Sequence, residues 1–148
     1  MSCSYIELHA GSAFSFLDGA CLPEELAGAC AAYAMPAMAL LDRDGVYGAP
    51  RFHLAATKAG IRAHIGAELS VTTTVTSNPK SEIRNPKSPL LYPLLAETRE
   101  GYQNLCRLIT RMKLRAPKGM GVIHEDELPE YSRGLICLTG GGRSVTGA

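Results

Sequence analysis

Several absences narrow the class of this 148-residue chain, which contains no tryptophan. Its five cysteines form neither a Cys-x-x-Cys pair nor a zinc-binding spacing, which excludes a disulfide framework and indicates reduced thiols. The N-terminus lacks the basic and long apolar segments of a signal peptide, and no apolar run reaches the length of a membrane span. We therefore expect a cytoplasmic protein without a membrane partner.

The overall charge gives no indication of a large anionic partner such as nucleic acid. The formal net charge is only +1, so no global basic surface for nucleic acid is expected. The 46% content of hydrophobic residues, at this length, suffices for one domain with a buried core.

Apolar runs typical of strands alternate with segments of helical periodicity, which predicts a parallel α/β architecture. Alanine-rich helical segments begin near proline residues, and Thr98 is a good N-cap for the longest one. The number of strands is too low to close a barrel. Strands are expected at 5–8, 37–41, 62–75, 90–96 and 134–138, and helices at 22–33, 50–60 and 98–114.

One segment breaks this alternation. The sequence Asn-Pro-Lys-Ser at 78–81 recurs at 85–88, and Asn-Pro pairs favour turns while proline removes a backbone donor. Residues 77–88 offer no apolar face that could offset the entropy of ordering them. We expect a disordered surface insertion there.

Three strand ends carry side chains that can bind a divalent metal ion. His9 follows the first apolar run, Asp42 follows the second, and Glu68 lies toward the end of the third. Because the carboxyl ends of parallel strands gather at one edge of a sheet, these three residues are candidates for one shared site. Histidine and carboxylate ligands suit zinc, manganese or magnesium and the hydrolytic chemistry that such ions support.

The longest predicted helix carries a basic stripe. Arg107, Arg111 and Arg115 recur every four residues, so they lie on one face of the helix. This stripe could follow a DNA backbone, although a solvated helix face is the simpler interpretation given the near-neutral total charge.

Four phrases of the sequence together resemble one known family: ELHAGSAFSFLDGA, DRDGVYGAPRF, GYQNLCRLITRMKLRAPKG and GLICLTGG. They are similar to the N-terminal polymerase-and-histidinol-phosphatase (PHP) domain of bacterial C-family DNA polymerases, above all the error-prone members. The resemblance implies a partial, distorted β/α barrel with metal ligands at the strand tips. It also implies the rest of a polymerase chain as partner and DNA as that polymerase's substrate, so residues 1–148 are expected to be a fragment without the remaining PHP and polymerase domains.

The chain departs from the metal-competent pattern of that family at two positions. His9-Ala10-Gly11 replaces His-x-His, and Asp42-Arg43 replaces Asp-His, while Glu68 matches the family's glutamate. An arginine cannot ligate a cation and repels it. The resemblance therefore implies a degraded metal site of His9, Asp42 and Glu68, with weak or no metal binding and a structural role; a PHP-type metal-dependent phosphoesterase is the alternative.

A different enzyme class gives a second alternative. MALLDRDGV also resembles the first motif of haloacid-dehalogenase-like phosphatases, an apolar strand followed by Asp-x-Asp-Gly. In that interpretation Asp42 is the nucleophile that accepts the phosphoryl group, Asp44 is the general acid/base, and magnesium bridges carboxylate and phosphate.

Overall fold

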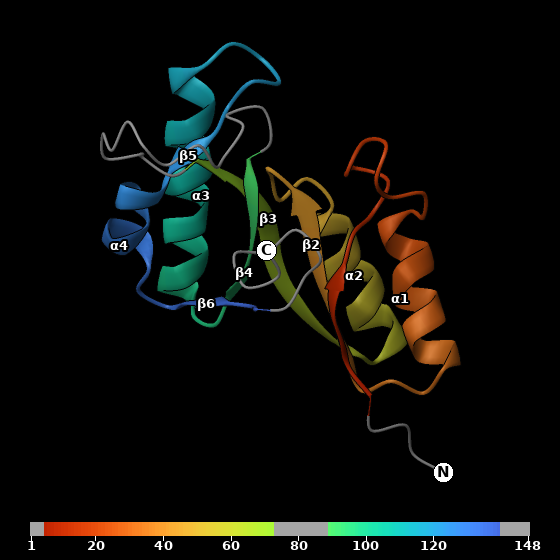
Figure 1. The fold of residues 1–148 in the computed structure, drawn as a ribbon. Coiled ribbons are helices and arrows are strands. Elements are labelled where there is room, and N and C mark those ends of the chain that lie inside the picture. The colour runs from red at the N-terminus through yellow and green to blue at the C-terminus, as the bar shows by residue number, and fades with distance from the viewer. Residues whose placement is uncertain (1–4, 73–88, 140–148) are drawn as a thin grey trace.

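Strands and helices alternate along the chain in the computed structural model, which describes residues 5–72 and 89–139 (Figure 1). The predicted insertion at 77–88 lies outside these residues. The elements are β1 (Glu7–Ala10), α1 (Pro23–Ala32), β2 (Ala37–Arg43), α2 (Ala49–Ala59), β3 (Arg62–Thr72), β4 (Leu90–Ala96), α3 (Arg99–Arg115), β5 (Ile123–His124), the 3-10 helix η1 (Glu125–Glu127), α4 (Leu128–Tyr131) and β6 (Leu135–Cys137).

The three longer helices begin and end where the sequence predicts. Pro23 opens α1, where a missing N–H costs nothing, and Gly60 ends α2 in the left-handed region at φ 72°. The Thr98 hydroxyl accepts a hydrogen bond of 3.0 Å from the amide of Gly101 and so caps α3. None of the described helices is long and apolar enough to cross a bilayer.

The strands form one sheet in the order β1-β2-β3-β4-β6. The short strand β5 pairs in parallel with the C-terminal end of β3. The strands β1, β2 and β3 are parallel, as predicted, but β4 is antiparallel to both β3 and β6. The expectation of parallel strands throughout was therefore wrong for β4. A parallel return needs a crossover, usually a helix, and the sequence between β3 and β4 contains no helical pattern.

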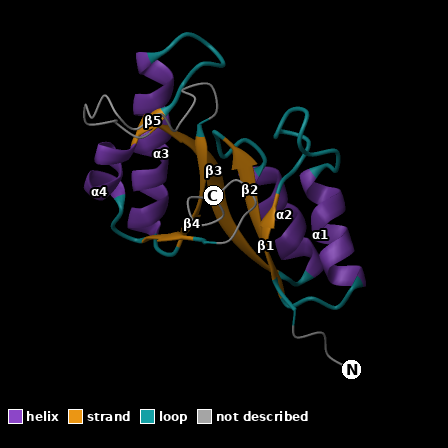
Figure 2. Cartoon of the chain, in the orientation of Figure 1, coloured by secondary structure: helices purple, strands orange, loops and turns teal. Residues whose placement is uncertain are grey.

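The longer helices pack on one face of the sheet (Figure 2). Successive side chains of a strand point to opposite faces. On β3, Ala63 and Ile65 pack against the α1–α2 cluster, and the same alternating set continues as Ala67, Leu69 and Val71 against α3. A smaller cluster of Ala39, Leu41 and Leu95 occupies the opposite face. Helices outside and apolar side chains inside are the arrangement of a β/α barrel wall, which confirms the predicted fold class.

The outer edge of β1 is covered by one of its own side chains. Among the described strands β1 pairs only with β2. The amide of His9 donates to Oε1 of Glu7 at 2.8 Å, and the hydroxyl of Tyr5 donates to Oε2 of Glu7 at 2.6 Å. The hydrogen bond from Tyr5 is the main reason that the pKa of Glu7 lies below its usual value. Glu7 thus occupies a donor that would otherwise face solvent at the sheet edge.

Two helical glycines should respond in opposite directions to alanine. A Cβ at Gly101 would overlap the carbonyl oxygen of Gly134, whereas a Cβ at the exposed Gly28 of α1 meets no atom within 4 Å. We expect Gly101→Ala to lower the free energy of unfolding by about 1–3 kcal/mol through overpacking. We expect Gly28→Ala to raise it by about 0.4–1 kcal/mol, because alanine restricts the unfolded chain. Urea denaturation of both variants measures the difference, and equal effects would contradict the packing of α3 against Gly134.

Candidate functional site

The fold brings together two of the three predicted metal ligands, His9 and Glu68. The imidazole Nε2 of His9 lies 2.9 Å from Oε1 of Glu68, across 59 positions of sequence. Both side chains are partly accessible, with 38% and 21% of their surface exposed. His9 lies inside β1 and not beyond the strand end that the sequence indicated, whereas Glu68 lies within the 11-residue β3, inside the predicted strand 62–75.

The third predicted ligand, Asp42, points away from this pair. In the parallel pairing of β2 with β3, Arg43 is level with Glu68 and Asp42 is level with Ala67. Paired residues of neighbouring strands share a face, so Arg43 is the β2 residue on the face of Glu68. Asp42 follows Leu40 on the helix-covered face, where Leu40 packs with α1 and α2.

The carboxylate of Asp42 is buried, with 1% of the residue exposed, and both of its oxygens accept hydrogen bonds. Oδ1 accepts from the amide of Ser12 at 2.8 Å and from the hydroxyls of Ser12 and Ser15 at 2.7 and 3.1 Å. Oδ2 accepts from the amide of Gly48 at 3.0 Å. Three of these donors converge on Oδ1 and one reaches Oδ2, and together the four hydrogen bonds hold the buried carboxylate in place. Gly48 is required here, because a Cβ would lie 2.5 Å from Oδ2.

Arg43 is also engaged within the chain. Its guanidinium Nη1 lies 2.7 Å from Oδ2 of Asp18, and its amide donates to the hydroxyl of Ser15 at 3.0 Å. The signal for these partners was in the sequence, because Ser12, Ser15 and Asp18 recur every three residues. This spacing did not stand out, because a serine or aspartate in a loop is common and carries no signature by itself.

These residues do not fit a metal ion. Within residues 5–72 and 89–139 no group of three or more His, Cys, Asp or Glu side chains is placed to hold one. His9 and Glu68 supply two ligands, Asp42 is buried on the other face, and Arg43 adds a positive charge on the face of Glu68. Zinc sites in proteins use three or four protein ligands, and His9 and Glu68 supply only two. The metal-ligand roles of His9, Asp42 and Glu68 therefore stay predictions.

Asp44 is likewise held by neighbours. Its Oδ1 accepts from the amide of Ser70 at 2.7 Å and its Oδ2 from the hydroxyl of Ser70 at 2.9 Å. Asp44 has a left-handed backbone at φ 51°, and its amide donates to the carbonyl of Glu68. It therefore fastens the turn after β2 to β3. This geometry does not provide the free carboxylate pair that the haloacid-dehalogenase interpretation requires.

Comparison with known proteins decides the family. The PHP domain family model matches residues 7–147 of the chain. The chain belongs to the PHP domain family. An error-prone DNA polymerase of Mycobacterium bovis is 42% identical over 134 residues, which is 90% of this chain and 12% of the relative. The chain thus spans about an eighth of the length of this much larger protein.

Two solved structures share the fold. An amidohydrolase from Chromobacterium violaceum, determined with bound sulfate and no metal, gives a TM-score of 0.52 at 25% identity and matches 72% of this PHP chain and 32% of its own. A candidate metal-dependent phosphoesterase from Bifidobacterium adolescentis gives a TM-score of 0.54 at 15% identity over 97% of this chain and 46% of its own. The PHP family membership and these barrel-like neighbours confirm the predicted family and fold class.

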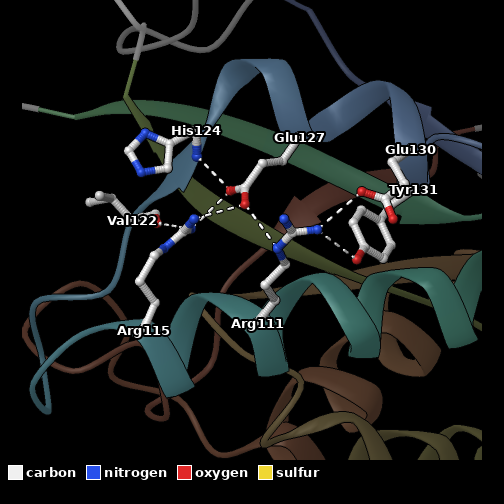
Figure 3. A network of polar contacts seen from close by, with 7 residues as sticks. All are labelled: Arg111, Arg115, Val122, His124, Glu127, Glu130 and Tyr131. Atoms are coloured by element: carbon white, nitrogen blue, oxygen red, sulfur yellow. Dashed lines mark hydrogen bonds and ion pairs between the residues drawn. The ribbon is translucent and has the colours of Figure 1, made fainter.

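The arginine stripe of this PHP domain makes contacts that the sequence did not predict (Figure 3). Arg111 lies 3.0 Å from both Glu127 and Glu130 and donates to the hydroxyl of Tyr131 at 3.2 Å. Arg115 contacts both carboxylate oxygens of Glu127 at 2.7 and 2.8 Å. These ion pairs, which we call the Glu127 clasp, fasten η1 and α4 to α3.

The third arginine differs from the other two. Arg107 donates to the side-chain oxygen of Asn104 at 3.3 Å, on its own helix. The clasp neutralises part of the charge that a DNA backbone would need, since two carboxylates lie against two of the three arginines. DNA binding by Arg107, Arg111 and Arg115 stays a prediction.

The clasp holds the pKa of Glu127 at about 2, below its usual 4.5, chiefly because Arg115 hydrogen-bonds to the ionised carboxylate. The amide of His124 adds a further hydrogen bond of 3.0 Å. A carboxyl group with a lowered folded-state pKa stabilises the fold above its unfolded pKa, and that stabilisation is lost as the pH falls toward 2.

We expect Glu127→Gln to lower the free energy of unfolding at pH 7 by roughly 1.5–3 kcal/mol, the usual range for hydrogen bonds to charged groups. The matched control Glu130→Gln, at a carboxylate with 64% of its surface exposed, should cost less than about 1 kcal/mol. Denaturant titrations between pH 7 and 2 measure both. The gap between wild type and Glu127→Gln should close as the pH falls from about 4.5 toward 2, and a gap independent of pH would contradict the clasp.

Proposed function

We propose that this chain is the N-terminal PHP module of an error-prone DNA polymerase and that the parent protein extends DNA. The observation that supports this most directly is the 42% identity to an error-prone DNA polymerase over 90% of the chain. A second relative, from Anaeromyxobacter, carries the same name and is 44% identical over 107 residues. Because the match spans 12% or less of these relatives, polymerase activity is proposed for a longer parent and not for this chain alone.

Within that parent we propose a structural role for the module instead of hydrolysis. The two partly exposed residues that could receive a metal, His9 and Glu68, are bonded to each other. Arg43 of β2 is paired with Glu68 of β3, so it lies on the same face of the sheet as Glu68. The buried carboxylate of Asp42 points to the other face. A site with two ligands and a fixed cation lacks the charge that binds a divalent ion and activates water.

The retained His9–Glu68 pair supports one other candidate, a metal-dependent phosphoesterase of the PHP type. A histidine and a carboxylate in contact are a partial metal site or an acid–base pair, and both side chains are accessible to solvent. An assay of phosphoester hydrolysis separates this candidate from the structural role.

One assay measures hydrolysis by the purified chain, and a second measures primer extension. The purified chain, incubated with a chromogenic phosphomonoester and with single-stranded DNA in the presence of Mn²⁺ or Zn²⁺, should release no more product than its His9→Ala variant. Hydrolysis by the wild type that His9→Ala abolishes would establish the phosphoesterase instead. The chain alone should also extend no primer.

A chimera tests the polymerase context directly. We expect the Mycobacterium bovis polymerase to keep primer extension when its aligned segment of 134 residues is replaced by this chain, and to lose it when that segment is deleted. Retained synthesis after the deletion would show that the module does not support the polymerase.

A further inference from the structure

The loop between β1 and α1 contains two successive turns and presents three polar side chains to β2. The amide of Ser15 donates to the carbonyl of Ser12 at 2.8 Å, and the amide of Asp18 donates to the carbonyl of Ser15 at 2.9 Å. These two turns bring Ser12, Ser15 and Asp18 close to β2, where their side chains make hydrogen bonds.

These contacts lie at the end of β2, where two consecutive residues receive all three side chains. Asp42 accepts hydrogen bonds from Ser12 and Ser15, and Arg43 contacts Ser15 through its amide and Asp18 through its guanidinium. We call this set of five residues the β2 lock. Ser12 and Ser15 are themselves buried, with 0% and 4% exposed, so their hydrogen bonds are shielded from water.

The apolar side chains of the loop do not hold it in place. Phe16 and Leu17 have 84% and 91% of their surface exposed, and Leu17 has a left-handed backbone at φ 69°, which costs a branched side chain free energy. Phe14 is partly exposed and lies under the guanidinium of Arg51 at 5.7 Å. Phe16 and Leu17 are therefore not buried against the fold, and it is polar contacts that join this loop to β2.

We propose that Asp42 and Arg43 are positioning residues that fix the β1–α1 loop in place of a metal ion. In a metal-dependent site the ion draws strand tips and loops together through its ligands. Here the buried carboxylate gathers two hydroxyls and two amides, and the arginine supplies a permanent positive charge that pairs with Asp18. The order of the loop therefore depends on these two side chains and is independent of divalent metal.

A reporter in the loop can test this inference. The chain has no tryptophan, so Phe16→Trp places a single tryptophan, which can be excited selectively, at an exposed aromatic position of the loop. In this background, Asp42→Asn should lower the tryptophan anisotropy and raise hydrogen exchange at the amides of Ser12, Ser15 and Asp18 by about tenfold or more, the factor for a lost hydrogen bond of 1.4 kcal/mol. Ser15→Ala, a milder change, should shift both measurements in the same direction.

Asp44→Asn is the matched control, because Asp44 makes similar hydrogen bonds two residues away but to Ser70 and not to the loop. It should lower the melting temperature without a selective effect on the loop. If Asp44→Asn releases the loop as much as Asp42→Asn, or if Ser15→Ala leaves anisotropy and exchange unchanged, the β2 lock is not the positioning device.

The same reporter tests independence from metal. Addition of Zn²⁺ or Mn²⁺, or of EDTA, to the full chain should change neither the anisotropy nor the melting temperature of the folded protein. Stoichiometric binding by calorimetry that orders the loop, and that Asp42→Asn abolishes, would overturn the proposal. Refutation of the β2 lock by these tests would not change the result expected of the polymerase chimera. The two proposals can therefore be refuted independently.

Discussion

The register between β2 and β3 is the constraint on which the site depends. In a parallel pair, side chains at matched positions lie on the same face, and a shift of one residue would exchange the two faces. The observed register puts Arg43 beside Glu68 and sends Asp42 to the face that carries α1 and α2. One backbone alignment thus decides that a cation, and not a carboxylate, accompanies the His9–Glu68 pair.

Three buried or half-buried carboxylates of this chain obtain their hydrogen bonds in the same way, from backbone amides together with side-chain donors. Asp42 accepts backbone amides from Ser12 and Gly48, Asp44 accepts one from Ser70, and Glu127 accepts one from His124. Each also accepts from at least one side chain, so each joins segments that are distant in sequence or direction. A buried carboxylate without such donors would be costly. In this fold, acidic residues that resemble catalytic groups by sequence serve as hydrogen-bond acceptors.

Periodicity and end signals were sufficient to predict the longer elements. Thr98, Gly60 and the proline of α1 mark helix ends for local reasons that the sequence displays directly. The elements between 123 and 131 were missed, because two to four residues are too few to show a period, and their position depends on Glu127 contacting α3. The reversed β4 also escaped prediction, since strand direction follows from the connection and not from the strand's own residues.

In the candidate site, the residues that could carry chemistry were easier to predict than the groups that contact them. His9 and Glu68 do meet, because strand order brings their strands to β2 from either side. The separation of Asp42 from them depends on the one-residue alternation within β2 and on donors from a loop that has no apolar signature. The arginines of α3 were recognised as a stripe, but their acidic partners lie up to 19 positions further along the chain and can be found only from the fold.

The Glu7 side chain at the outer edge of β1 has a consequence for association between copies of the chain. An uncovered strand edge is a template for pairing with another strand, and a short charged edge suppresses such pairing. Because Glu7 holds the amide of His9 while it is ionised, protonation at low pH weakens that cover and removes the repulsion between two such edges at the same time. Acid solution therefore removes one of the features that keep the β1 edges of two copies apart.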